Sequence, residues 1–211
     1  DYPKGLAEFF QQAWEEKHGK GSVAAYESFT TRDTDFSSQL TKIIRSGAEV
    51  LFVPQYYNEV ALIVQQAEDL GWQGPIVGSD SWGSAETIGL CGEACYGQFF
   101  STHYAAAGAQ GATKDFIDRY NERYGYVPDD VAALTWDALG LAQAAIEGAG
   151  EITGQIKDDR KAVRDALANV KDFQGITGGM TFTEEGDPKK CAVIVKISDK
   201  GEFGFYKSVC P

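Results

Sequence analysis

The sequence contains few residues of several kinds on which familiar activities depend. Only two histidines occur among 211 residues, and 19 lysine and arginine residues stand against 31 aspartate and glutamate residues, a formal net charge of −12. Such a negative field repels nucleic acid and anionic lipid, so the composition argues against a nucleic-acid partner. No stretch approaches the roughly 18 apolar residues needed to cross a bilayer, so we expect no membrane-spanning helix.

A leader is also missing from the start of the sequence. Asp1 leads almost directly into an amphipathic segment, with no initiator methionine, basic segment or apolar segment ahead of it. We therefore expect that a segment has been removed ahead of Asp1, either a signal peptide or something larger.

The sequence contains four cysteines, an even number that is compatible with disulfide bonds. Residues 191–197 and 203–209 read as two strands around a turn near Gly201, and folding that hairpin places Cys191 opposite Cys210, within the distance a disulfide requires. Two unrelated buried thiols are the alternative. A disulfide would imply an oxidising compartment, either the periplasm or the cell surface.

The other two cysteines, Cys91 and Cys95, lie in a glycine-containing loop where a small disulfide ring can close. A zinc site is the weaker alternative for the four cysteines, because the two pairs lie far apart in the sequence and only His18 and His103 are available. We therefore predict two disulfides and no metal.

Hydrophobic periodicity predicts alternating helices and strands through residue 104. The predicted helices lie at 4–18, 34–46 and 58–70, and the predicted strands lie at 22–29, 50–54, 75–79 and 96–104. Strands that alternate with helices across short loops are the signature of βαβ units, so we predict an α/β fold with a doubly wound parallel sheet.

The pattern changes after Tyr104. A link of small residues at 105–112 is followed by predicted helices at 113–124, 129–148 and 158–170, with no strand between them. The only later strands are the segment 176–182 and the terminal hairpin. Three helices with so little sheet predict one face of a second, incomplete α/β lobe.

Two loops that follow predicted parallel strands carry distinctive side chains. Tyr56 and Tyr57 follow the strand at 50–54, and Asp80 and Trp82 follow the strand at 75–79. Loops at the carboxyl ends of parallel strands are where this architecture binds ligands. A carboxylate beside aromatic rings suits a small ligand with an ammonium group and an apolar part, although half-buried packing and helix capping are the bland alternatives.

An enzymatic interpretation has less support. Ser81 lies one substitution from the G-x-S-x-G turn of α/β-hydrolases, but a triad needs an acid and then a histidine, and only His103 follows. No strand is followed by G-x-G-x-x-G or by a P-loop, so no nucleotide cofactor is predicted.

Several segments resemble one family. They are DYPKGLAEFF at the start, the run from FSSQLTKII through QYYNEVALIVQQAEDLGW, GPIVGSDSW, PDDVAALTWDALGLAQAAIEGAG and FTEEGDPKK. Over nearly the whole chain these are similar to the branched-chain amino-acid-binding (leucine/isoleucine/valine-type) solute receptors of ABC transporters, which have a type I periplasmic-binding fold. The resemblance implies a secreted receptor, periplasmic or extracellular, that is not an enzyme.

The resemblance also implies a binding site. Tyr2 matches a tyrosine that faces the ligand, Tyr56 matches the tyrosine that covers the ligand side chain, and Asp80 matches the acidic residue that receives the α-ammonium group. Trp82 is expected to line the pocket. The acidic residue is often Glu in leucine-type members, so the shorter Asp80 leaves open whether the ligand is a branched-chain amino acid, another amino acid, or a related amine or amide.

By the same resemblance, residues 1–104 with 191–211 form a complete ligand-binding lobe 2, and 105–190 is a mostly helical remnant of lobe 1. The part that seats the ligand α-carboxylate is expected to be missing, so this chain alone should bind its ligand weakly or not at all. Hinge strands are expected near 101–104 and 190–193, with the closed form docking on a membrane permease. The ligand-sensing ectodomain of a signalling receptor is the alternative function.

Overall fold

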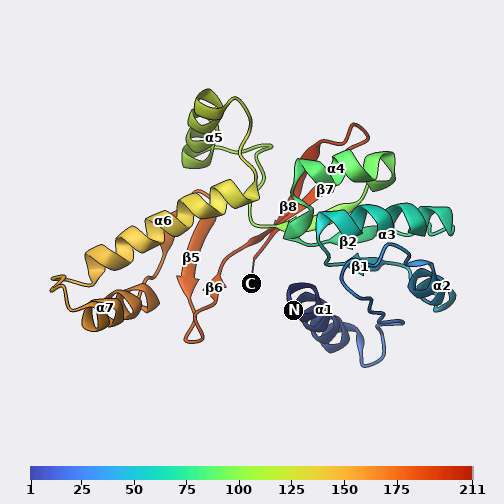
Figure 1. Ribbon diagram of the computed structural model, residues 1–211, viewed down its shortest axis with the longest axis horizontal. Helices are drawn as coiled ribbons and strands as arrows, with labels where there is room; N and C mark the ends of the chain where they lie inside the picture. The colour runs from blue at the N-terminus through green and yellow to red at the C-terminus, as the bar shows by residue number, and fades with distance from the viewer. Residues whose placement is uncertain (211) are drawn as a thin grey trace. The chain divides into compact units, whose positions relative to one another are not determined.

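A computed structural model of the chain describes residues 1–210. Its helices and strands group into two compact units (Figure 1). The first unit comprises Asp1–Thr102 and Ile194–Tyr206, and the second comprises His103–Val193 together with the segment that begins at Lys207. The chain therefore passes between the two units three times.

The first unit is built on a five-stranded sheet in the order β1-β2-β3-β7-β8. The strands β1 to β3 are parallel, with Leu51 opposite Ile76 and Val77 opposite Phe99, which confirms the predicted parallel sheet in this part. The five strands are β1 (Leu51–Val53), β2 (Ile76–Gly78), β3 (Phe99–Thr102), β7 (Ala192–Ile197) and β8 (Phe203–Val209).

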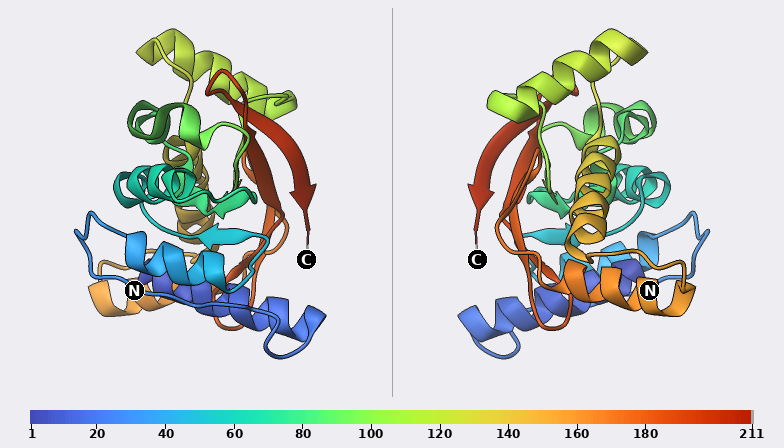
Figure 2. Two further views of the ribbon diagram at one scale, coloured as in Figure 1. Left: turned by 90° about the vertical axis from the view of Figure 1, so that its right-hand side faces the viewer. Right: turned by 90° about the vertical axis from the view of Figure 1, so that its left-hand side faces the viewer.

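The helices of this unit follow the predicted periodicity. They are α1 (Tyr2–His18), α2 (Ser37–Arg45), α3 (Tyr57–Asp69) and α4 (Ala85–Cys91), with short 3₁₀ turns η1 (Asp80–Trp82) and η2 (Gly92–Cys95). Helices α3 and α4 pack against each other (Figure 2). Because side chains alternate along a strand, Phe52 projects from the face opposite to Leu51 and Val53, and there its ring stacks on Phe10 of α1 at 4.4 Å between centroids.

The core of this unit combines the apolar strands with one face of α3. Val60, Ala61, Val64 and Ala67 of that helix are all at most 3% exposed, at the spacing that puts them on one side of the helix. Removing such side chains from water is the main stabilising contribution of a helix that packs on a sheet.

Two local predictions for this unit were wrong. The segment 22–29 was predicted as a strand, and its side chains do alternate between half-buried and exposed, but it pairs with no neighbour in a ladder. The loop predicted around Cys91 and Cys95 is instead helical at its start: Cys91 ends α4, which is capped by the Ser84 hydroxyl accepting from the Glu86 amide at 3.3 Å. The predicted loop signal came from glycines that α4 tolerates at its end.

The second unit is mostly helical, as predicted. Its helices are α5 (Gly111–Tyr124), α6 (Asp130–Gly148) and α7 (Ile156–Ala168), accompanied by a three-stranded antiparallel sheet of β4 (Phe173–Gly175), β5 (Gly178–Phe182) and β6 (Pro188–Lys189). Its buried cluster joins Tyr104, Phe116 of α5, Ala133 of α6 and Ile176 between β4 and β5. The sequence predicted a single strand at 176–182, whereas the structure has the β4–β5 hairpin.

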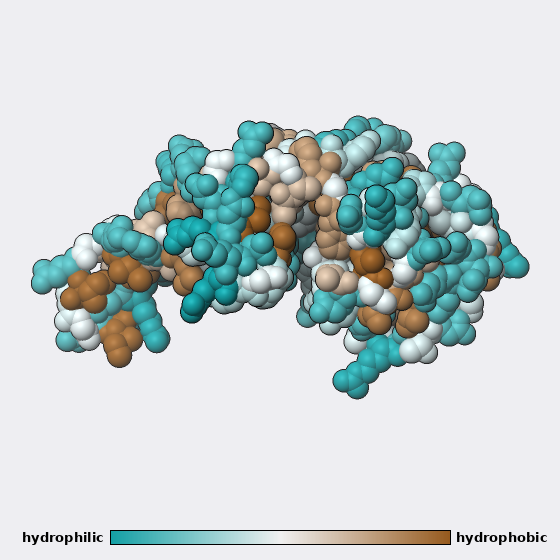
Figure 3. Space-filling model, turned by 90° about the horizontal axis from the view of Figure 1, so that it is seen from above, coloured by the Kyte–Doolittle hydropathy of each residue, from teal (hydrophilic) through white to brown (hydrophobic). Residues whose placement is uncertain are grey.

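One face of α6 is apolar and uncovered. Val131 is 71% exposed, Leu139 66% and Ile146 52%, and Ile156 at the start of α7 is 68% exposed. The space-filling view shows apolar side chains on the surface over α6 and α7 (Figure 3). A helix with a broad apolar stripe ordinarily buries it against another element, so this face lacks the partner that its sequence is suited to.

Across residues 1–210, no helix combines the length and the apolar character that crossing a bilayer would need.

Candidate functional site

The candidate site lies at the carboxyl ends of β1 and β2. These strands are parallel and in register, with Val53 opposite Gly78, so the loops that follow them leave the same edge of the sheet side by side. The first loop leads to Tyr56, which precedes α3, and the second leads through Ser79 into η1, where Asp80 stands first. The sheet therefore holds a tyrosine and an aspartate at neighbouring positions.

Tyr2, the first residue of α1, joins them from a distant part of the sequence. Its ring stacks on that of Tyr56, with centroids 5.4 Å apart and planes inclined by 30°. Its hydroxyl donates to the carboxylate of Asp80 and also lies 3.0 Å from the hydroxyl oxygen of Ser79. Three of the four predicted ligand-binding residues, Tyr2, Tyr56 and Asp80, are thus brought together.

These three side chains form an open surface with one charged group. Tyr56 is 49% exposed, and Asp80 and Tyr2 are half-buried. Burial, and then the hydrogen bond to Asp80, raise the pKa of the Tyr2 phenol above its usual value, so Tyr2 is a neutral hydrogen-bond donor at pH 7. Chemically, the surface offers carboxylate oxygens to an N–H donor and two ring faces to an apolar group.

Trp82 is not part of this surface. It is 0% exposed, its indole N–H donates to the Val53 carbonyl oxygen at 3.0 Å, and its ring lies against Gly78 of β2. The 3₁₀ turn η1 directs this side chain into the core while Asp80 stays at the surface. Trp82 therefore joins the ends of β1 and β2 within the core and exposes no surface from which to line the pocket that was predicted for it.

Sequence reasoning missed the serines on either side of Asp80. The hydroxyl oxygens of Ser79 and Ser81 are 3.0 Å apart, and the Ser81 hydroxyl donates to the backbone carbonyl of Gln55 at 2.6 Å. Ser79 is 2% exposed. Two small hydroxyl residues flanking the candidate carboxylate were the available signal.

That hydrolase alternative lacks its required contact. Ser81 directs its single hydroxyl hydrogen to the Gln55 carbonyl, and its other neighbour is Ser79. Within residues 1–210, no imidazole hydrogen bonds to Ser81. A serine nucleophile needs a base that removes its proton, and a backbone carbonyl cannot serve as that base.

Both cysteine pairs are disulfides. Cys91 at the end of α4 bonds to Cys95 of η2, and Cys191 bonds to Cys210 across the β7–β8 hairpin, as the predicted register implied. No cysteine is free. The zinc alternative is therefore contradicted for these four residues, because zinc binds cysteine as a thiolate.

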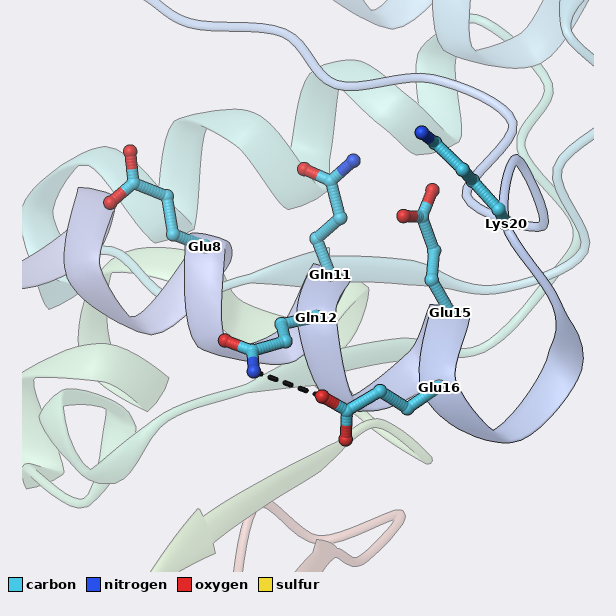
Figure 4. A pocket seen from close by; sticks show the side chains of 6 residues that line it. All are labelled: Glu8, Gln11, Gln12, Glu15, Glu16 and Lys20. Carbon is cyan, nitrogen blue, oxygen red and sulfur yellow. Dashed lines mark hydrogen bonds between the residues drawn. The ribbon is translucent and has the colours of Figure 1, made fainter.

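A second concave surface lies along α1. It is lined by the polar side chains of Glu8, Gln11, Gln12, Glu15 and Glu16 of α1 and by Lys20 just after the helix. In Figure 4, Gln12 and Glu16 point to one side of the helix and Gln11 and Glu15 to the other. Gln12 donates to Glu16 at 2.9 Å, and no residue of α1 is buried. Exposed charged side chains on one helix are ordinarily a solvated face, so no site is assigned here.

Known proteins resemble this chain over nearly its whole length. The family model described as periplasmic binding protein matches residues 1–202. A Leu/Ile/Val-binding protein homologue of Brucella melitensis is 31% identical over 189 residues, which cover 88% of this chain and 48% of the relative. The leucine-, isoleucine-, valine-, threonine- and alanine-binding protein of Pseudomonas aeruginosa is 26% identical over 89% of this chain and 48% of its own length. The chain thus spans about half the length of these curated relatives.

Solved structures agree with the sequence relatives. A leucine-binding protein of Thermotoga maritima has a TM-score of 0.88 at 32% identity, covering 100% of this chain and 58% of that one. A branched-chain amino-acid substrate-binding protein of Streptococcus pneumoniae, solved with isoleucine, has a TM-score of 0.79 at 31% identity and covers 100% of this chain and 57% of its own. The predicted type I periplasmic-binding fold is confirmed, and the chain belongs to the periplasmic binding protein family.

Proposed function

We propose that this chain is the ligand-contacting part of an extracytoplasmic receptor that captures a small neutral amino acid for uptake by an ABC transporter. The observation that carries the proposal is the meeting of Tyr2, Tyr56 and Asp80 on one surface at the strand ends. Relatives named for binding leucine, isoleucine, valine, threonine and alanine support an aliphatic ligand. The proposed role is binding and release, with no chemical step.

The side chains suggest how the ligand is held. The ligand ammonium donates to the Asp80 carboxylate, and the exposed ring of Tyr56 covers its aliphatic part. A charge-assisted hydrogen bond in a partly desolvated site is stronger than a neutral one, so Asp80 contributes most to affinity. The ring contributes by removing apolar surface from water, in proportion to the size of the ligand side chain.

We further propose that residues 1–104 with 191–211 are a complete lobe and that 105–190 is part of a second lobe. The exposed apolar face of α6 supports this division, because Val131, Leu139 and Ile146 are suited to covering a sheet. Relatives about twice as long support it too. The seat for the ligand α-carboxylate is then expected on residues that this chain does not contain, so the chain alone binds its ligand weakly.

In a receptor of this kind, ligand capture closes a hinge and the closed form docks on a membrane permease. The segments 101–104 and 190–193 are the proposed hinge strands. The disulfides Cys91–Cys95 and Cys191–Cys210 support a periplasmic or extracellular location, where disulfides persist.

Titration calorimetry of the receptor with both lobes present, using isoleucine, leucine, alanine and γ-aminobutyrate, tests the assignment. Asp80→Asn should reduce the binding free energy of the tightest-binding amino acid by ~2–5 kcal/mol, because the ligand ammonium loses its ionic partner. Asp69→Asn removes an exposed carboxylate at the end of α3 and should leave affinity unchanged. Equal affinities of the wild type and Asp80→Asn for every ligand would contradict the role of Asp80.

A further inference from the structure

The hydroxyl groups around Asp80 form a chain with a fixed direction. The carbonyl oxygen of Gln55 can only accept, so the single hydrogen of Ser81 is committed to it at 2.6 Å. Ser81 can then only accept from Ser79, whose oxygen lies 3.0 Å away. The Ser79 hydroxyl donates its single hydrogen to Ser81, so it can only accept from Tyr2, whose oxygen is also 3.0 Å away. The chain therefore runs from Tyr2 through Ser79 and Ser81 to the backbone.

One hydrogen is missing from this arrangement. The cluster has four oxygen–oxygen contacts, because the Tyr2 hydroxyl also contacts Asp80, but the three hydroxyl groups supply only three hydrogens. Ser79 and Asp80 thus compete for the hydrogen of Tyr2. In the ligand-free protein the charged carboxylate is the stronger acceptor, so Asp80 receives it and buried Ser79 goes without a donor.

We propose that Ser79 is a positioning residue of the ligand site, which takes the Tyr2 hydrogen when a ligand ammonium group donates to Asp80. This inference rests on the proposed function. The ammonium supplies the hydrogen that Asp80 accepts, and Tyr2 turns its hydroxyl toward Ser79. Asp80, Ser79, Ser81 and the Gln55 carbonyl then each accept one hydrogen. Ser79 thereby favours ligands with a charged amine over analogues that lack it, without touching the ligand.

The change of hydrogen-bond partner also affects how Tyr2 holds the start of α1. Helix α1 begins at Tyr2 and contains no buried residue, so the tyrosine contacts with Ser79, Asp80 and Tyr56 hold its first turn on the rest of the unit. The Tyr2 hydroxyl donates to Asp80 in the ligand-free protein and to Ser79 in the ligand-bound protein. Because it keeps a partner in both states, the Tyr2 ring stays in place over the site. Without Ser79, Tyr2 has only the group that the ligand also needs.

A double-mutant cycle tests the competition. In the receptor with both lobes present, Ser79→Ala should weaken isoleucine binding about fivefold, the value of one hydrogen bond made only in the bound state. In the Tyr2→Phe background the same change should alter affinity less than about 1.5-fold, because the hydroxyl it would accept from is gone. 3-Methylpentanoate, which is isoleucine without its amine, should bind wild type and Ser79→Ala equally. A loss of equal size in the Tyr2→Phe background would overturn the proposal.

A ligand-free measurement separates this inference from the proposed function. The pKa of Tyr2, already raised by burial, can be followed by the ¹³Cζ resonance, which Tyr2→Phe assigns. The hydroxyls of Ser79 and Ser81 both lower the pKa of this phenol, so Ser79→Ala should raise it. Ser46→Ala, whose hydroxyl donates to Ile43 in α2, should change nothing. A pKa of Tyr2 that is unchanged or lower in Ser79→Ala contradicts the contact between Ser79 and Tyr2, while absent amino-acid binding contradicts only the function.

Discussion

The indole of Trp82 lies against the α-carbon of Gly78, so closely that a Cβ added there would stand 2.2 Å from the ring. The same indole donates to the Val53 carbonyl at 3.0 Å and thereby links the ends of β1 and β2. The position of Asp80 depends on this contact, because Trp82 and Asp80 belong to the same 3₁₀ turn. A buried aromatic side chain therefore sets where a half-buried carboxylate lies.

Gly78→Ala should destabilise the chain and displace the η1 turn together. Overpacking of this kind costs ~1–3 kcal/mol, since either the strand or the indole must move. Urea denaturation measures the loss, and calorimetry should show weaker isoleucine binding. The matched control is Gly89→Ala in α4, where no atom lies within 4 Å of the added Cβ and alanine favours the helix. If Gly78→Ala were as stable as Gly89→Ala, the packing of Trp82 would not be the constraint.

Asp137 of α6 holds the second unit together. It is 3% exposed and accepts from the Ile176 amide at 2.8 Å and from the Thr177 amide at 2.9 Å, with a third bond from the Thr177 hydroxyl. Lys190 donates to the same hydroxyl at 2.6 Å. Asp137→Ala leaves buried amides without an acceptor and should lower the free energy of unfolding by about 3 kcal/mol.

The comparison for Asp137 is Asp115→Ala, which removes an exposed carboxylate from α5 and should cost little. Hydrogen exchange localises the effect: the amides of Ile176 and Thr177 should lose protection in Asp137→Ala and keep it in Asp115→Ala. Retained protection at both amides would show that the β4–β5 turn does not depend on the carboxylate.

The parallel sheet could be predicted because its signals are local. Short apolar runs such as Leu51–Val53, each followed by an amphipathic helix, are compatible with few structures other than a buried parallel strand. The segment 22–29 has the same alternation but no ladder, and alternation alone cannot tell whether an edge strand finds a partner. Pairing is a property of the neighbour, which the segment itself does not encode.

The site was only partly predictable for a similar reason. Tyr56 and Asp80 follow strands, where ligand loops are expected, but Trp82 belongs to the same loop and points inward. Asp80 and Trp82 lie only two positions apart in the sequence, and the geometry of η1 separates the directions of their side chains. The hydroxyl chain through Ser79 needed atomic positions, because a serine beside a carboxylate has many possible partners.

Tyr104 gives the second unit a sensitivity to alkaline pH. Burial, followed by the charges of Asp129 and Asp130, raises the pKa of its phenol to about 12. The unfolded chain, with a tyrosine pKa near 10, loses this proton first, so stability falls as the pH rises between about 10 and 12. Tyr104→Phe should remove this part of the decline in urea denaturation across that range. An identical pH profile for the variant would contradict the shifted titration.

Tyr56→Ala tests whether the exposed ring covers the ligand side chain. The ring is 49% exposed and is stacked on Tyr2 in the ligand-free protein. Its removal should weaken the binding of isoleucine and leucine by ~1–2 kcal/mol and the binding of alanine by less. The loss of affinity follows the apolar area of the ligand that the ring covers. Tyr57→Ala is the matched control, since the neighbouring tyrosine is 40% exposed and makes no ring contact with Tyr2 among the described residues. A loss of equal size for all three amino acids would mean that Tyr56 acts on the fold of the site through Tyr2, and not on the ligand.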